Sequence, residues 1–236
     1  MPAEVAACAA VTVRVARSED DRARVFALRA RARSGAVAPL SDAYDRLPNA
    51  MLLLAESRFD GQALGTLRVL TADRGPMMVD GLLELPASLK CQSIAEGSRL
   101  VVCEGPHEAQ VRRMLWKAFH RYCLAAQVQA MLIAARDAAA REYQWLGFTD
   151  VFPDGSLFAP RGRDVATHRL MCLGVFEARE AMMNNAHPLH EFFFVERHPE
   201  IDLLGPGAAP RPRSPIPRAL SGSFRRAADL ADLVVV

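Results

Sequence analysis

The chain of 236 residues is 51% apolar and 24% charged, which excludes a wholly disordered chain and suits one domain with an appendage. Its apolar runs fall short of the roughly 20 residues that span a bilayer, and no basic segment of a signal peptide precedes the apolar N-terminus. The net charge is only +2, and 27 of the 29 basic residues are arginine. The five cysteines form no CxxC pair, which favours reduced thiols in a cytoplasm over a disulfide framework or a zinc site.

The first part of the chain predicts a strand, a helix and a hairpin. The β-branched run 11–15 is typical of a strand. Ser18 and the acidic residues after it are typical of a helix start, and apolar spacing continues this helix to about residue 35. Residues 35–48 are expected to form a loop. The apolar runs 51–56 and 63–70 flank a turn at Asp60 and Gly61, which predicts a hairpin.

The second part predicts strands alternating with helices. After the irregular residues 73–93, strands are expected at 100–103, 129–134, 148–152 and 167–175. A long helix is expected at 107–127, and a short one is expected to be capped by Asp137 and ended by Gly147. This alternation indicates parallel strands, which the hairpin makes a mixed sheet. The expected fold is α/β, a mixed twisted sheet with helices on both faces.

Composition changes near residue 204. We expect one domain over residues 1–203 and a mobile tail rich in proline and arginine over residues 204–236. The tail carries five arginines but few aromatic residues, so no nucleic-acid partner is expected. Peripheral contact of the tail with a membrane stays open.

Charged residues occur at four places on or beside the expected core elements. Arg29 follows Val25 and Phe26 by four and three residues, so it lies on or beside an apolar helix face, where an unpaired charge is costly. Two interpretations are left open, an internal network of ion pairs and a polar functional site at the sheet's edge. The charged residues at these places are Arg29, Arg31, Asp42, Asp45, Arg68, Glu96 and Arg99.

The segments LRAR, DAYD, LGTLR, EGSRLVV and YQWLGF occur in this order on these elements. Together they resemble the autoinducer-synthase branch of the GNAT acyltransferase superfamily, and most closely its long-chain N-acyl amino acid synthases. The resemblance covers about residues 11–177. It implies a GNAT-type fold, whose sheet is splayed near Val101. It also implies transfer of a medium- or long-chain fatty acyl group from the phosphopantetheine of acyl carrier protein to the α-amine of a small amino acid.

Carried over residue by residue, the resemblance implies roles for the charged set. Glu96 is expected to act as the base, directly or through water, and Arg99 and Tyr143 complete the catalytic set, with Tyr143 donating to the leaving thiolate. Backbone N–H groups around the splay are expected to stabilise the oxyanion. Arg29, Arg31 and Arg33 are unranked candidates for the acceptor's carboxylate. The residues expected to bind substrate are Arg29, Arg31, Asp42, Asp45, Arg68, Val101, Val102 and Cys103.

Two departures from the family patterns bear on the substrates. Residues 104–110 lack the glycines that wrap a CoA pyrophosphate, so CoA is the less favoured donor and no permanently bound cofactor is expected. Residues 32–37 lack the aromatic side chains that enclose S-adenosylmethionine in homoserine-lactone synthases. The alternatives are an acyl-homoserine-lactone synthase, a CoA-dependent acetyltransferase and an inactive fold used as a binding module. No metal is expected, and membrane contact through a lipid product stays open.

The long helix carries basic residues roughly opposite its apolar stripe. They are Arg113, Lys117 and Arg121, with His120 beside them. One interpretation is a solvated face, and the other is a docking surface for the acidic acyl carrier protein.

Overall fold

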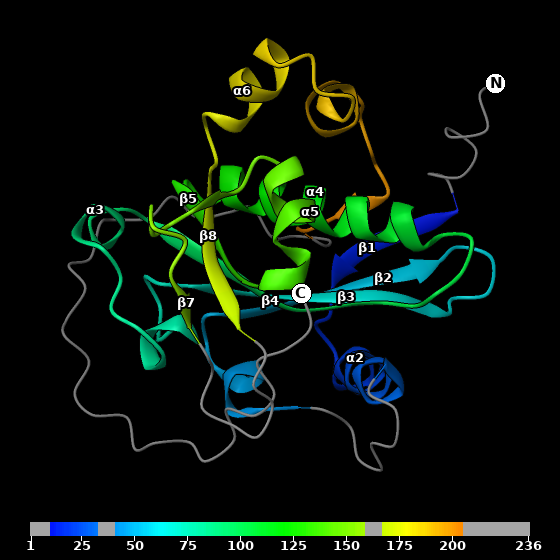
Figure 1. Ribbon diagram of the computed structural model, residues 1–236. Helices are drawn as coiled ribbons and strands as arrows, with labels where there is room; N and C mark the ends of the chain where they lie inside the picture. The colour runs from blue at the N-terminus through cyan, green and yellow to red at the C-terminus, as the bar shows by residue number, and fades with distance from the viewer. Residues whose placement is uncertain (1–9, 33–40, 159–166, 205–236) are drawn as a thin grey trace.

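The computed structural model describes residues 10–32, 41–158 and 167–204. Within these residues nine strands form one mixed sheet with the order β6-β8-β5-β4-β3-β2-β1-β9, and β7 pairs with β8 (Figure 1). The expected tail, apart from Leu204, and residues 33–40 lie outside the described part of the chain. The strands are β1 (Val11–Val15), β2 (Ala50–Ser57), β3 (Ala63–Thr71), β4 (Ile94–Val102), β5 (Ala130–Arg136), β6 (Thr149–Asp150), β7 (Leu157–Phe158), β8 (His168–Gly174) and β9 (Ile201–Asp202).

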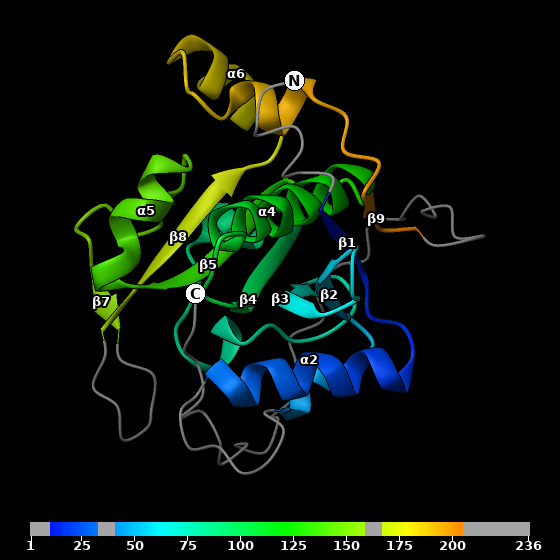
Figure 2. The ribbon, with the colours of Figure 1, turned by 90° about the vertical axis from the view of Figure 1, so that its right-hand side faces the viewer.

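Helices cover both faces of the sheet, as the sequence predicted (Figures 1 and 2). Helix α2 (Glu19–Ala32) packs Val25 and Leu28 toward one face, and the Ser18 hydroxyl accepts the Asp21 N–H at its start. Helices α4 (Glu108–Ala125) and α5 (Ala140–Trp145) cover the other face. The shorter elements are α3 (Ala87–Lys90), α6 (Ala178–Asn184), the 3₁₀ turns η1 (Ala43–Arg46), η2 (Val79–Gly81) and η3 (Asp137–Ala139), and a π-helical turn η4 (Glu191–Val195).

The predicted hairpin is confirmed, with Leu53 opposite Leu67 in the antiparallel pair β2–β3. Its turn includes Gly61 at φ 68°, a conformation that suits glycine. The two central strands β4 and β5 are parallel, and their pairing runs from Ile94 with Ala130 to Gly97 with Ile133. Beyond Gly97, β4 continues to Val102 without β5, so the sheet opens between them. This gap is the splay that the resemblance implied near Val101.

Residues 176–203 return across the outer side of α4 and are called the C-terminal cover below (Figure 2). The cover contains α6 and η4 and ends in β9, which pairs in parallel with β1. As a result α4 is buried on both sides, with the sheet beneath it and the cover above it. The sequence pattern predicted only the buried stripe that faces the sheet.

The expected solvated or docking face of α4 is therefore wrong for two residues. Lys117 is 1% exposed, and its Nζ donates to the carbonyl oxygens of Phe192 and Glu196 in the cover. Arg121 donates from Nη1 to the carbonyl oxygen of His198 at 2.9 Å. Both side chains hold the cover on α4, so Lys117 is buried beneath it and Arg121 is half-buried against it.

Two smaller expectations are also corrected. Asp137 does not cap the short helix, because its carboxylate accepts from Nε of Arg169 at 2.5 Å. The strand expected at 100–103 begins earlier, at Ile94, so Glu96 lies inside a central strand and not at its entry. Gly147 does end the short helix, at φ 94°.

No helix among the described residues has both the length and the apolar character needed to cross a bilayer.

Candidate active site

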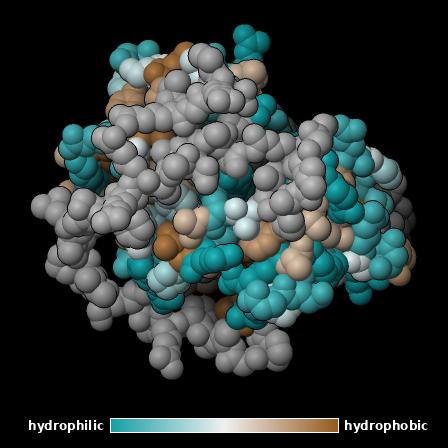
Figure 3. All heavy atoms as spheres, turned by 90° about the horizontal axis from the view of Figure 1, so that it is seen from below, coloured by the Kyte–Doolittle hydropathy of each residue, from teal (hydrophilic) through white to brown (hydrophobic). Residues whose placement is uncertain are grey.

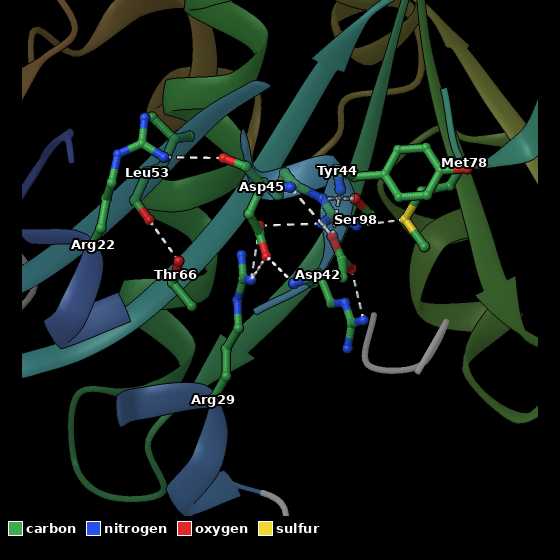
Figure 4. Close-up of polar contacts among 11 residues, drawn as sticks. Arg22, Arg29, Asp42, Tyr44, Asp45, Leu53, Thr66, Met78 and Ser98 are labelled. Carbon is green, nitrogen blue, oxygen red and sulfur yellow. Dashed lines mark hydrogen bonds and ion pairs between the residues drawn. The ribbon is translucent and has the colours of Figure 1, made fainter. Parts of the chain in front are cut away.

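Three arginines and two aspartates meet on the sheet face that carries α2 (Figure 4). Nη1 of Arg29 lies 2.9 Å from both carboxylate oxygens of Asp45. Nη1 of Arg68 donates to Asp42 at 2.6 Å and to Asp45 at 3.1 Å. Nη2 of Arg99 donates to the other Asp42 oxygen at 2.8 Å. We call these five residues the charge cluster, and the sequence predicted all of them.

Local structure explains why both aspartates face the sheet. Asp42 caps η1 by accepting the N–H groups of Tyr44 and Asp45, and Asp45 accepts the N–H of Asp42 in return. This reciprocal capping box fixes the two carboxylates side by side. Arg29 reaches them from α2 and Arg68 from β3, so the cluster joins helix, loop and sheet.

A bulge in β4 brings Arg99 to the same face. Arg68 lies opposite Ser98 and Thr66 opposite Val101, so Arg99 and Leu100 together oppose Leu67. Arg99 adopts φ 56°, a conformation that non-glycine residues rarely take. The extra residue turns the Arg99 side chain to the Ser98 side, whereas strict alternation would place it on the opposite face.

Burial and opposite charges act against each other in this cluster. Burial alone raises the pKa of Asp42, but the guanidinium groups of Arg68 and Arg99 outweigh it and hold the pKa below its usual value. Burial lowers the pKa of Arg29 to about 10, against the opposing effect of Asp45. The ion pairs are thus needed to keep these side chains charged in a buried site. This is the internal network of ion pairs that was one of the two interpretations of the sequence.

Glu96 lies beside the cluster on the same face of β4. It is 1% exposed and accepts the backbone N–H of Val79 at 3.3 Å, so η2 closes over it. Burial raises the pKa of its carboxyl to about 7, against the lowering effects of the Val79 N–H and Arg68. A carboxyl with a pKa near neutrality suits a general base, which must take up a proton under working conditions.

Tyr143 lies on the opposite face, within the core between the sheet and α4. Its ring packs edge-on against Trp116 and Phe148, with centroids 5.6 Å and 6.1 Å away. Its hydroxyl is buried and has no hydrogen-bond partner among the described residues. Burial raises the pKa of Tyr143, so the hydroxyl keeps its proton and is available as a donor.

Beyond Gly97 the backbone of β4 is paired with β3 but not with β5. The N–H of Cys103 donates to the carbonyl oxygen of Leu64 at 2.8 Å, and the alternation of the ladder turns the N–H of Val101 toward β3 as well. The N–H of Val102 points the other way, into the gap left by β5. Of the three expected oxyanion donors, Cys103 and Val101 are therefore engaged, and Val102 retains the predicted role.

The remaining predicted residues lie apart from the cluster. Arg31 is exposed at the end of α2 and makes no ion pair with the cluster, and Arg33 lies outside the described residues. Sequence reasoning missed the contacts of Ser98 with Nε of Arg68 at 3.1 Å, and of Tyr44, whose ring lies 5.7 Å from the Arg68 guanidinium. Ser98 lies two residues from Glu96, so the period of two in a strand indicates its shared face.

Among the described residues, no group of three or more histidine, cysteine or acidic side chains is placed to hold a metal ion.

The underside of the molecule, seen in Figure 3, shows mostly hydrophilic described residues. Acidic residues in the first turn of α2, Glu19 and Asp20, are exposed. The charge cluster lies inward of this polar surface, because Arg29 and Arg68 are almost fully buried.

The sequence model of the N-acyl amino acid synthase family FeeM matches residues 22–155, more than half of the chain. The chain belongs to the FeeM family of N-acyl amino acid synthases. It is therefore an acyltransferase, and the matched range contains the charge cluster, Glu96 and Tyr143. Compared with curated proteins, the sequence shows no significant match.

Solved structures similar to this FeeM-family chain share its GNAT-type fold. FeeM, an N-acyl amino acid synthase from uncultured soil microbes, has a TM-score of 0.59 at 15% identity, covering 77% of this chain and 96% of FeeM. The acyl-homoserine-lactone synthase LasI has a TM-score of 0.55 at 16% identity, covering 70% and 90%. The CoA-dependent synthase BjaI, with S-adenosylmethionine and isopentyl-CoA, has a TM-score of 0.54 at 16% identity, covering 75% and 90%. At such identities the likeness confirms the fold, and the family match carries the activity.

Proposed function

We propose that this acyltransferase moves a medium- or long-chain fatty acyl group from acyl carrier protein to the α-amine of an amino acid. Family membership supports the reaction class. The observation that carries the proposal is Glu96, a buried carboxyl with a pKa of about 7 beside a cluster of arginines. An α-amine with a pKa of roughly 8 must lose a proton before it attacks a thioester, and Glu96 has the matching affinity for that proton.

In this proposal the two substrates approach the gap from opposite faces of the sheet. The amino acid binds on the face of Glu96 and Arg99, and the thioester arm lies on the face of Tyr143. Glu96 takes a proton from the ammonium group, the amine nitrogen bonds to the thioester carbon, and the carbonyl oxygen becomes an oxyanion near the Val102 N–H. When the C–S bond breaks, the sulfur leaves as thiolate and receives the proton of the Tyr143 hydroxyl. The nitrogen gives up its second proton to water as the amide forms, and Tyr143 takes a proton back from water.

We assign the acceptor's carboxylate to Arg99. Arg99 is 8% exposed, and its Nε has no hydrogen-bond partner among the described residues. Its Nη2 already binds Asp42, so the guanidinium is held in place while Nε keeps a hydrogen available. Arg29 is already paired with both oxygens of Asp45, and Arg31 is exposed, so neither is as well placed.

The topology supports one edge of the sheet as the docking surface for the carrier protein. Because β4 and β5 are parallel, their carboxyl ends and the starts of α4 and α5 lie at one edge, which is also the open end of the splay. Arg113 lies near the start of α4, and the exposed Arg136 and Arg141 lie at the end of β5 and in α5. Arg136 and Arg141 replace Lys117 and Arg121 in the expected docking set, which keeps Arg113. They would attract an acidic carrier toward the entrance of the thioester arm.

The proposal is tested with purified protein and decanoyl, dodecanoyl or hexadecanoyl carrier protein. Release of the carrier's free thiol is measured with each amino acid in turn, and the matching acyl-CoA is tested in parallel. We expect thiol release that depends on one or a few amino acids and that Glu96→Gln abolishes. Transfer from CoA to an amine with no transfer from the carrier would contradict the donor. Methylthioadenosine released from added S-adenosylmethionine would identify a lactone synthase and contradict the acceptor.

The docking surface has a matched pair of variants. Arg141→Glu should raise KM for the acyl carrier protein about tenfold or more while kcat changes little, because it reverses a charge at the contact. Arg197→Glu makes the same change at an exposed arginine of the C-terminal cover and should leave KM unaltered. Equal changes of KM in the two variants would show that only the net charge of the protein affects carrier binding, and would contradict this docking surface.

A further inference from the structure

The Glu96 carboxyl is almost completely shielded from its surroundings. The residue is 1% exposed, and one carboxylate oxygen accepts the N–H of Val79 at 3.3 Å. Met77 and Met78 are buried as well, so η2 and the residues before it close over this carboxyl. A proton that travels from a bound amine to Glu96 therefore needs a polar group that reaches both.

Tyr44 brings such a group to the same turn. Its ring extends from η1 toward Met78 and packs against the apolar cluster to which Met78 belongs (Figure 4). The hydroxyl at the end of the ring lies against Gly81, where an added Cβ atom would be 4.0 Å from Tyr44 Oη. The turn η2 thus contacts Glu96 through the Val79 N–H and the Tyr44 hydroxyl through Gly81.

The electrostatic surroundings of Tyr44 suit a hydroxyl that transfers protons. Tyr44 is half-buried, and its hydroxyl makes no hydrogen bond within the described part of the chain. Burial raises the pKa of Tyr44, and the Glu96 carboxylate adds the largest effect of any charged group. Asp42 and Asp80 raise this pKa further, whereas Arg68 lowers it. The hydroxyl therefore keeps its proton near neutral pH, so it can donate one proton while it accepts another.

The expected position of the acceptor lies beside Tyr44. One Asp42 oxygen accepts from Nη2 of Arg99 at 2.8 Å, and the other accepts the Tyr44 N–H at 2.9 Å. The same carboxylate therefore holds Arg99 and Tyr44 next to each other. An α-amino acid has a single carbon between its carboxylate and its amine. An acceptor whose carboxylate binds Arg99 thus presents its ammonium group close to Tyr44.

We infer that the Tyr44 hydroxyl carries the proton of the acceptor's ammonium group to Glu96. The ammonium nitrogen gives one proton to Tyr44 Oη, while the proton of the hydroxyl passes to the Glu96 carboxylate, directly or through one water molecule. Tyr44 ends the step as the neutral phenol that it was, and the nitrogen becomes the neutral amine that attacks the thioester. The inference rests on the proposed function in taking Glu96 as the base.

The test uses Tyr44→Phe, which removes the hydroxyl and keeps the ring beside the Arg68 guanidinium, 5.7 Å away. Thiol release from acyl carrier protein is measured at pH values on both sides of neutrality. We expect kcat to fall about a hundredfold or more, as on the loss of a proton-transfer group. The rise of kcat/KM through about pH 7, which reports the ionisation of Glu96, should disappear. Tyr122→Phe, which removes a hydroxyl from α4 on the other face of the sheet, should match the wild type.

A double variant separates a shared proton path from a structural effect. Tyr44→Phe combined with Glu96→Gln should be no slower than the slower of the two single variants, because each change breaks the same path. Melting curves accompany each variant, and Tyr44→Leu, which also lacks a hydroxyl, replaces Tyr44→Phe if the latter does not fold.

Two results would overturn the inference. One is wild-type turnover in Tyr44→Phe, and the other is a double variant whose loss of rate is the product of the two single losses, since independent effects multiply. Wild-type turnover in Glu96→Gln would instead contradict the proposed function, because Glu96 would then not be the base. The two failures are therefore distinct.

Discussion

Glutamine in place of Glu96 should alter how stability depends on pH. The pKa of this carboxyl rises from its usual 4.5 to about 7 because burial disfavours the ionised form. The folded protein therefore binds this proton more tightly than the unfolded chain does. The resulting contribution to stability is complete below the unfolded pKa and is lost as the pH rises through about 7.

The size of the effect follows from the shift. A rise of this extent corresponds to about 3 kcal/mol, which wild-type protein loses between about pH 5 and about pH 8 through this one group. The glutamine of the Glu96→Gln variant cannot ionise, so the variant does not lose this stability as the pH rises. The difference in the free energy of unfolding between the two proteins should change by about 3 kcal/mol over this range, in favour of the variant at high pH.

Urea denaturation at several pH values measures this difference. Other titrating groups cancel because both proteins contain them, and Glu180→Gln, at an exposed carboxyl of α6, is the matched control that should show no such trend. A constant difference between Glu96→Gln and wild type across the pH range would refute the raised pKa. In the wild type, kcat/KM should rise through about pH 7 as Glu96 ionises, and the variant should lose most turnover at every pH.

Three further substitutions test the rest of the structure. Asp45→Asn should lower the free energy of unfolding by about 3–5 kcal/mol, because it leaves Arg29 and Arg68 buried with less opposite charge, and an unchanged melting temperature would contradict the charge cluster. Tyr143→Phe should keep or raise the melting temperature, because the hydroxyl has no hydrogen-bond partner among the described residues. The same variant should lower kcat, and an unaltered kcat would show that Tyr143 is not the proton donor. Lys117→Met should lower the free energy of unfolding by about 1–3 kcal/mol, because the carbonyl groups of Phe192 and Glu196 lose their donor. Chemical denaturation measures this change, and unaltered stability would mean that these two hydrogen bonds do not stabilise the fold.

Local patterns predicted the parts of the fold that local chemistry determines. The β-branched run at Val11–Val15, the Ser18 cap and the hairpin around Gly61 all follow from propensity and turn chemistry. The charge cluster was also predictable in kind. Arg29 stands where an unpaired charge is costly on a helix, so its position alone indicated nearby carboxylates. The motif order then pointed to Asp42 and Asp45.

The misassigned residues depend on contacts between distant parts of the chain. Lys117 looked solvated because the periodicity of α4 records one buried side, whereas the cover that buries the other side comes some 75 residues later. Arg99 was correctly predicted from the motif order, but its place on this face depends on a bulge, and strand alternation alone would put it on the other face. The sequence predicted the Cys103 N–H as an oxyanion donor, but this N–H donates to the carbonyl oxygen of Leu64, on a neighbouring strand.

The arrangement of Glu96 and Tyr143 on opposite faces was also beyond sequence reasoning. The resemblance assigned each a catalytic role, but it gave no geometry. The structure adds that the pairing of β4 with β5 ends at Gly97, next to Glu96, which leaves the gap in which the proposed reaction occurs. Two substrates that meet in this gap would not compete for the same volume.

The most direct test of the account is mass spectrometry of organic extracts from bacteria that express the chain, compared with bacteria that express Glu96→Gln. The account predicts a series of fatty acyl amino acids, with members spaced by two methylene groups, that is present with the wild type and absent with the variant. Identical extracts from the two cultures, with both proteins folded, would contradict it, as would acyl-homoserine lactones in place of acyl amino acids.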